Sequence, residues 1–161
     1  MSPQCLMAHG NRFELTEVED ESGYWNETYL GRVMAASDFD RDGDLDLLVN
    51  HLDKPLAILR SDTNTDGRWI QLELVGRQCE RDGIGARVVV KTKSGKYSQW
   101  MTAGDGYFCS DEAVLDFGLG RGAEIESVEV HWPSGELQTF NSPVADRRYL
   151  IVQGDVELYQ R

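Results

Sequence analysis

Residues 38–46 restrict the possible folds of this chain more than any other stretch, because they read DFDRDGDLD. Aspartates occupy alternate positions around a single glycine, Gly43: they are Asp38, Asp40, Asp42, Asp44 and Asp46. Like charges this close repel one another, so a folded protein keeps them only where water, positive side chains or a cation neutralises them. Arg41 is the only positively charged residue within the stretch. We therefore predict that a hard divalent cation with a preference for oxygen ligands, Ca²⁺, binds here.

The spacing of the aspartates agrees with this prediction. Calcium loops take side-chain oxygens from positions 1, 3 and 5, turn sharply at position 6 and supply a backbone carbonyl from position 7. Counted from Asp38, the side-chain ligands are Asp38, Asp40 and Asp42, the turn is at Gly43, and the carbonyl belongs to Asp44. Position 12 is Val49 instead of the usual bidentate Glu, so we expect Asp46 to complete the ligand shell. The alternative is a solvated acidic turn without an ion.

A second stretch, residues 62–73, also satisfies the helical calcium-loop pattern, with Asp62, Asn64, Asp66, Gly67 and Glu73 at the required positions. Its flanks alternate like strands, and no helical pattern brackets it. We therefore interpret residues 62–68 as a polar connection between strands and expect Glu73 to point to solvent. Whether this stretch holds a second Ca²⁺ stays open.

The remaining pattern predicts an all-β chain. From Trp69 onward, short alternating segments are separated by turns, which is typical of an antiparallel β-sandwich or small barrel. We interpret residues 118–122 as one of these turns and residues 1–12 as an irregular lead-in. Before Trp69, the segments VMAAS, LDLLVN and LAILR surround the aspartate stretch and predict most of one β-propeller blade.

A lone blade cannot bury both of its faces, because propellers close several blades into a ring. The chain carries no second copy of the aspartate motif. We therefore predict three parts: residues 1–61 as a terminal repeat with the calcium loop, residues 62–68 as a connecting loop, and residues 69–161 as a separate β domain. The chain would then be the C-terminal part of a longer repeat protein.

Two motif sets resemble known families. Residues 31–50, GRVMAASDFDRDGDLDLLVN, are similar to an FG-GAP/VCBS repeat, the calcium-binding blade of integrin-like β-propellers. Further along, RDGIGARV (81–88), GDGYFCSDEAVLDFGLG (104–120) and VEVHWPSGELQ (128–138) resemble the ASPIC/UnbV domain. Members of that family commonly carry this domain after such repeats, so the resemblance implies a partial blade followed by an ASPIC/UnbV-like β domain. Asp116 is a departure, since many members have a histidine there.

The charge and hydrophobicity of the chain indicate which partners and which compartment are compatible with it. The net charge is −12, and the chain has no basic stripe, which argues against binding to nucleic acid or to an anionic membrane. No apolar run is long enough for membrane insertion, and residues 1–13 lack the pattern of a signal peptide. We expect an extracellular or periplasmic protein whose signal peptide lies outside this sequence. Cys79 and Cys109 could form a disulfide in such a compartment or remain thiols.

No catalytic motif surrounds His9, His51 or His131, so we predict a non-enzymatic module with structural Ca²⁺, used in adhesion or in recognition of an unknown protein or glycan. The alternative is a carbohydrate-binding or accessory domain of a secreted enzyme, with Trp25, Trp100 or Tyr107 on an exposed platform. A catalytic domain of unrecognised chemistry is the third possibility. It would require a deep pocket lined by convergent carboxylates or by His131.

Overall fold

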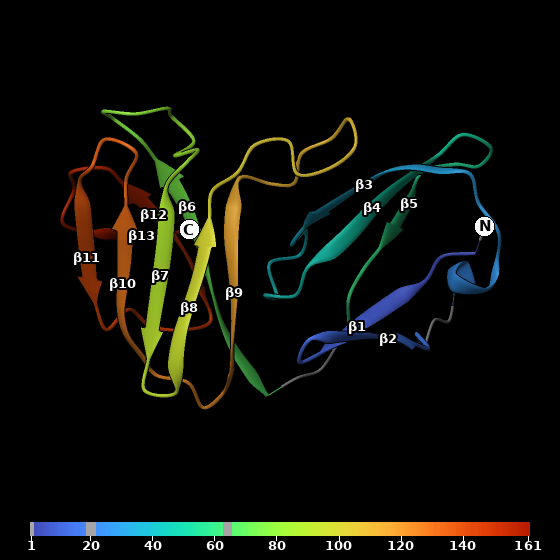
Figure 1. Cartoon of the computed structure of the whole chain (residues 1–161), viewed down its shortest axis with the longest axis horizontal. Helices are drawn as coiled ribbons and strands as arrows, with labels where there is room; N and C mark the ends of the chain where they lie inside the picture. The colour runs from blue at the N-terminus through green and yellow to red at the C-terminus, as the bar shows by residue number, and fades with distance from the viewer. Residues whose placement is uncertain (1, 19–21, 63–65) are drawn as a thin grey trace.

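The computed structural model describes residues 2–18, 22–62 and 66–161 of the chain. It confirms the prediction of an all-β protein, in which strands form several sheets and one short 3₁₀ helix, η1 (Tyr24–Asn26), interrupts them. Figure 1 shows the strands from β6 onward on one side of the molecule and β1 to β5 on the other. Among the described residues, no helix is long and apolar enough to cross a membrane.

Two four-stranded sheets form a sandwich in the C-terminal part. One sheet has the order β11-β10-β7-β8, with bounds Leu137–Asn141, Ile125–His131, Arg87–Thr92 and Gly95–Trp100. The other has the order β13-β12-β6-β9, with bounds Leu158–Gln160, Arg147–Val152, Gly67–Val75 and Val114–Arg121. Side chains that alternate along these strands meet between the sheets, because a strand turns successive residues to opposite faces. The core includes Ile70, Leu72, Val88, Val90, Leu115, Phe117, Val128, Val130 and Ile151.

Two details of the sandwich differ from the sequence prediction. The prediction of a turn over residues 118–122 is wrong for residues 118–121, which belong to β9, with Gly118 paired to Trp69 and Gly120 to Arg68. A register shift between Arg68 and Trp69 and the positive φ of Gly120 (78°) let these glycines continue the strand with a local irregularity. In addition, β12 pairs with β6 in parallel, while the other pairings of these sheets are antiparallel.

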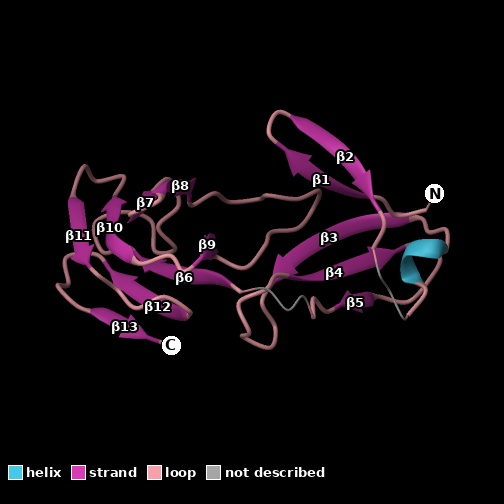
Figure 2. Ribbon diagram, turned by 90° about the horizontal axis from the view of Figure 1, so that it is seen from below, coloured by secondary structure: helices cyan, strands magenta, loops and turns pink. Residues whose placement is uncertain are grey.

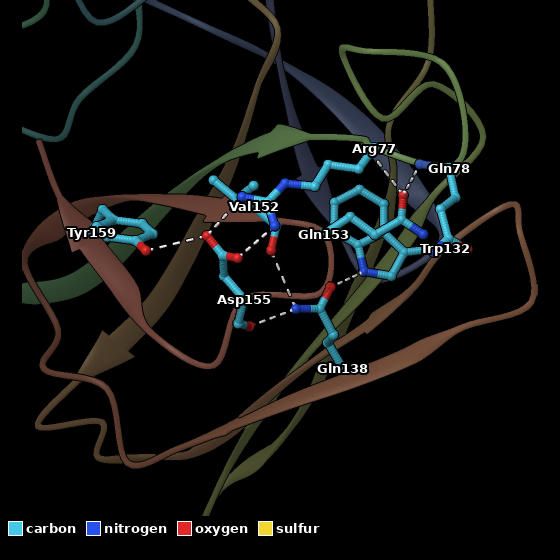
Figure 3. A network of polar contacts seen from close by, with 8 residues as sticks. All are labelled: Arg77, Gln78, Trp132, Gln138, Val152, Gln153, Asp155 and Tyr159. Atoms are coloured by element: carbon cyan, nitrogen blue, oxygen red, sulfur yellow. Dashed lines mark hydrogen bonds and ion pairs between the residues drawn. The ribbon is translucent and has the colours of Figure 1, made fainter.

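Buried glutamines join the loops at one end of the sandwich (Figure 3). The Gln153 Oε1 atom accepts hydrogen bonds from the backbone N–H groups of Arg77 (3.0 Å) and Gln78 (2.9 Å). Gln138 accepts a hydrogen bond from the indole N–H of Trp132 and donates to the carbonyl of Asp155 (2.8 Å). Because each buried amide has partners on both sides, burial of these polar groups is compensated, and the end of the sandwich is closed.

The N-terminal part contains a three-stranded antiparallel sheet of β3 (Gly31–Ser37), β4 (Asp46–His51) and β5 (Ala57–Leu59). The interpretation of residues 1–12 as an irregular lead-in is wrong, because β1 (Cys5–His9) and β2 (Arg12–Thr16) form a hairpin. The hairpin turn places Gly10 at a φ of 64°, a conformation that glycine adopts without steric cost. Figure 2 shows this hairpin beside the β3–β4 sheet.

Candidate metal centre

The aspartate stretch forms the loop between β3 and β4, and the two strands pair from Ser37 with Asp46 at the loop base. One carboxylate oxygen from each of Asp38, Asp40 and Asp42 lies within 4.8 Å of the others. Calcium binds oxygens at about 2.3–2.6 Å, so two ligands of one ion lie at most about 5 Å apart. The geometry of these three carboxylates therefore fits a single Ca²⁺.

Asp38 is the most constrained member of this group, with 5% of its surface exposed. Its Oδ1 atom accepts the backbone N–H of Asp42 (3.2 Å), and its Oδ2 atom accepts that of Gly43 (3.0 Å). Oδ2 also accepts the side-chain amide of Gln71 in β6 (2.7 Å). These bonds hold the loop in its curved form and orient the carboxylate before any ligand arrives.

Asp46 has a different role within the loop. It is 1% exposed, and its two oxygens accept the backbone N–H groups of Phe39 (Oδ2, 2.9 Å) and Ser61 (Oδ1, 2.9 Å). The group of three converging carboxylates does not include it. Asp46 therefore joins both ends of the loop to the segment after β5, and its place in a ligand shell stays a prediction.

Crowding of negative charge is visible at Asp44. Partial burial raises the pKa of the Asp44 carboxyl, and repulsion from Asp42, Asp38, Asp46 and Asp40 raises it further. Its backbone N–H donates to the Oδ1 atom of Asp42 (2.9 Å), which keeps the peptide chain close to the three carboxylates. A bound cation would relieve this repulsion.

Sequence reasoning missed one positive charge near the loop. Arg60 lies 3.7 Å from the Oδ2 atom of Asp40 and 2.6 Å from the Oδ1 atom of Asp62. Both contacts are exposed, so they compensate little of the charge on the loop. Arg60 follows β5, and only the return of the chain in the fold brings it beside Asp40.

The loop also packs against the sandwich. A Cβ atom on Gly43, whose φ is 100°, would lie 2.2 Å from the Trp69 ring, so the indole in β6 occupies the space next to this glycine. Gln71, two residues further along β6, is 1% exposed and reaches Asp38. A glutamine between the apolar residues Ile70 and Leu72 of this strand was the available sequence signal for this contact.

Asp116 lies beside Gln71 in the register of β6 and β9. Burial raises the pKa of Asp116 to about 6, a hydrogen bond from Gln71 opposes the rise, and the charge of Asp38 adds to it. The Asp116 Oδ1 atom is buried without a hydrogen-bond partner among the described residues. The aspartate at this position therefore adds a poorly compensated charge to the contact between the loop and the sandwich.

The long connection between β8 and β9 forms a second contact between the two parts of the chain (Figure 1). Asp111 accepts the backbone N–H of Ala36 through Oδ1 (2.8 Å), and Glu112 accepts the hydroxyl of Ser37 through Oε2 (2.7 Å). Glu112 also pairs with Arg148 of β12 at 2.5 Å. These bonds hold the connection against the outer edge of β3.

The acidic residues of the second candidate loop pair with separate arginines. Asp62 pairs with Arg60 (2.6 Å), Asp66 with Arg121 (2.9 Å) and Glu73 with Arg148 (3.4 Å). Glu73 alternates with buried Leu72 and Leu74 along β6 and is partly exposed, as expected, and its carboxylate also pairs with Arg161 (3.3 Å). Asn64 lies outside the described residues.

The side chains of His51 and His131 have structural partners. His51 is 6% exposed, its Nε2 atom lies 2.9 Å from the Tyr24 hydroxyl, and its Nδ1 atom lies 2.9 Å from the Pro55 carbonyl. Its ring stacks on Tyr29 with centroids 4.6 Å apart. The Nε2 atom of His131, on β10, lies 3.5 Å from the guanidinium of Arg87, on β7.

Cys79 and Cys109 are both free thiols. The Sγ atom of Cys79 contacts the side chain of Gln153, and that of Cys109 contacts the backbone carbonyl of Met34.

Comparison with known proteins identifies the C-terminal part. The family model described as "ASPIC and UnbV" matches residues 76–158, just over half of the 161-residue chain. The chain belongs to the ASPIC and UnbV family. Within this ASPIC/UnbV chain, the matched region begins directly after β6 and ends at the first residue of β13, so it covers most of the sandwich but not β6.

Curated relatives of this family member carry the name cartilage acidic protein 1. The mouse protein is 42% identical over 108 residues, and the human protein is 40% identical over 112 residues. The matches cover 63% and 65% of this chain but only 16% of each relative. The Xenopus tropicalis protein is 36% identical over 109 residues, again 16% of its length. The ASPIC/UnbV chain therefore corresponds to a small part of these proteins.

Proposed function

We propose that this chain is a non-enzymatic, calcium-stabilised recognition module, in which Ca²⁺ binds the β3–β4 loop and holds it against the ASPIC/UnbV sandwich. The convergence of the Asp38, Asp40 and Asp42 oxygens within 4.8 Å carries the proposal. Asp44 would add its carbonyl and Asp46 its carboxylate as further ligands. The ion would be structural, because it would neutralise crowded carboxylates that the sandwich holds in place through Gln71.

The partly covered faces of the β3–β4–β5 sheet support the further proposal that it is an FG-GAP/VCBS-type blade. Met34 and Ile58 lie on opposite faces of the sheet and are 57% and 64% exposed. In a ring of blades, neighbouring sheets would cover such faces. The curated relatives are several times longer than the region they share with this chain, which leaves room for such neighbours in proteins of this kind.

The proposed setting is outside the cytoplasm, in the extracellular space or the periplasm. The relatives are named cartilage acidic protein 1, and this chain is acidic too, with a net charge of −12. Millimolar calcium outside the cell would suit a loop that lacks the bidentate Glu of tight sites, since extracellular modules bind in the range of about 10⁻⁴–10⁻³ M. Recognition or adhesion would then involve a protein or glycan partner.

A role in carbohydrate binding is the second candidate, and Trp100 favours it. This side chain is 60% exposed and lines a cleft beside the loop. Trp25 is only half-exposed and packs edge-on against Tyr24, while Tyr107 packs against Phe108 at an exposed turn. Of the three aromatic residues expected as platforms, Trp100 combines an exposed ring with a place in a cleft.

The proposal is tested by calcium titration with calorimetry and thermal unfolding. We expect Ca²⁺ to raise the Tm of the wild type and a chelator to reverse the rise, because a ligand that binds only the folded state stabilises it. The Asp40→Asn/Asp42→Asn double variant should lose this response. Asp62→Asn/Asp66→Asn removes the same number of negative charges from the second candidate loop and should keep this response. No calcium response in the wild type would contradict the proposal.

A further inference from the structure

A cleft of about 360 Å³ lies between the β3–β4 sheet and the sandwich, next to the proposed calcium loop. Its walls come from both parts of the chain: Ala36, Ser37 and Leu45 on one side, and the segments around residues 82–84 and 99–116 on the other. The volume falls in the range of about 300–1,000 Å³ that is typical of small-ligand sites. The β8–β9 connection, held to β3 through Asp111 and Glu112, closes one side.

Trp100 gives this cleft an aromatic wall. It ends β8 and is 60% exposed, although large aromatic side chains are usually buried more deeply. The guanidinium of Arg87, on the neighbouring strand β7, lies over the indole at 5.9 Å from its centroid. Arg87 does not line the cleft, so it supports the ring from outside. Ile84 and buried Met101 add apolar surface beside the indole.

Polar groups surround this apolar surface. Among the described residues, the Asp82 carboxylate and the Ser110 hydroxyl have no hydrogen-bond partner within the protein, although both residues line the cleft. The Asp105 carboxylate accepts the hydroxyl of Thr102, which fixes its direction at the rim. The cleft thus offers acceptors and a hydroxyl around an aromatic plane, and a ligand with many hydroxyl groups on a partly apolar ring matches this pattern.

The charge of the cleft narrows the ligand class. Among the residues that the structure describes, its lining includes five acidic residues and no Lys, Arg or His: Asp82, Asp105, Asp111, Glu112 and Asp116. A sulfated or carboxylated sugar would be repelled by these groups. A neutral sugar would instead donate its hydroxyl protons to carboxylates, which form stronger hydrogen bonds than neutral acceptors.

We infer that this cleft binds a neutral saccharide unit, with its ring stacked on Trp100 and its hydroxyl groups donating to Asp82 and Asp105. The inference rests on the recognition role proposed above and names the site and the ligand class for it. Leu45 connects it to calcium, because this side chain belongs to the aspartate loop and also lines the cleft. Calcium that orders the loop therefore also orders one wall of the cleft.

The experiment screens the full chain, in buffer with Ca²⁺, against an array of neutral, sialylated and sulfated glycans and against Lys- and Arg-rich peptides. Neutral glycans should bind, and calorimetry should give their Kd. Trp100→Ala should weaken that binding by about tenfold or more through loss of the ring contact. Tyr107→Ala removes an aromatic ring that is 69% exposed on the β8–β9 connection but does not line the cleft, so it should leave Kd unchanged.

The readouts separate this inference from the proposed function. The calcium-dependent Tm of wild type and Trp100→Ala is measured in the same preparations, which also shows that the variant is folded. If calcium stabilises both but no neutral glycan binds, the saccharide inference fails and the calcium proposal stands. Preference for sulfated glycans, binding of basic peptides alone, or equal glycan binding by Trp100→Ala would likewise overturn the inference. Glycan binding without any calcium response would contradict the calcium proposal alone.

Discussion

The side-chain amide of Gln71 donates to the Asp38 Oδ2 atom at 2.7 Å, and this bond joins the sandwich to the aspartate loop. Both residues are almost fully buried, at 1% and 5% exposed. A hydrogen bond to a buried carboxylate contributes more than one between neutral groups, since the desolvated charge needs a donor. The candidate metal centre is therefore built by two parts of the chain that lie 33 residues apart.

Replacing Gly43 should destabilise the contact between loop and sandwich. Gly43→Ala places a Cβ atom 2.2 Å from the Trp69 ring, which is a steric clash. The φ of 100° at this position is also a backbone conformation that residues with a side chain rarely adopt. We expect a loss of about 2–4 kcal/mol in the free energy of unfolding, measured by chemical denaturation. Gly122→Ala, at a φ of 62° with open space around it, should cost only about 1 kcal/mol. Equal losses would mean that the Trp69 contact is unimportant.

Asp46→Asn should separate loop architecture from metal binding. The Asp46 carboxylate accepts hydrogen bonds from the backbone N–H groups of Phe39 and Ser61. An asparagine amide has one acceptor oxygen, so it could accept one of these bonds, and its NH₂ group would then face the other N–H donor. We expect a loss of about 1–3 kcal/mol that is already present in chelator. Asp40→Asn, at an exposed position, should have little effect in chelator and lower the response to Ca²⁺. If Asp46→Asn is harmless without calcium, these backbone contacts do not hold the loop.

Asp116 should make stability depend on pH when calcium is chelated. Its pKa is raised to about 6 in the folded protein from an ordinary 3.8, so the folded state binds the proton more tightly than the unfolded state. The contribution of the Asp116 carboxyl to the free energy of unfolding is therefore complete below about pH 3.8 and is lost as the pH rises through about 6. Asp116→Asn should be more stable than wild type at pH 7.5, by on the order of 2 kcal/mol, and nearly equal at pH 4.

Thermal and denaturant unfolding at several pH values would check this, with Asp66→Asn as the control. Asp66 pairs with Arg121 on an exposed surface, so its substitution should shift stability by a small amount that varies little between pH 5 and 8. A difference between Asp116→Asn and wild type that stays constant over this range would show that the Asp116 carboxyl does not titrate near pH 6. The charges facing it from neighbouring elements are those of Asp38, Glu112 and Arg148.

The sequence alone determined the strand content, the turn at Gly43 and the alternating aspartates. It also determined the family motifs of the C-terminal part, because strand periodicity, glycine at positive φ and ligand spacing are local properties of a chain. It misjudged residues 1–12 and 118–121, where pairing partners elsewhere override weak local preference.

Only the tertiary structure decided which groups surround the aspartate loop. Gln71, Arg60 and Trp69 are distant from it in the sequence or carry no metal-ligand pattern, yet they orient Asp38, contact Asp40 and support Gly43. It also gave Asp46 a partner in Ser61 and placed Trp100 on a cleft lined by both parts of the chain. The physical reason is that hydrogen bonding and side-chain packing depend on distance in space, which local sequence patterns do not specify.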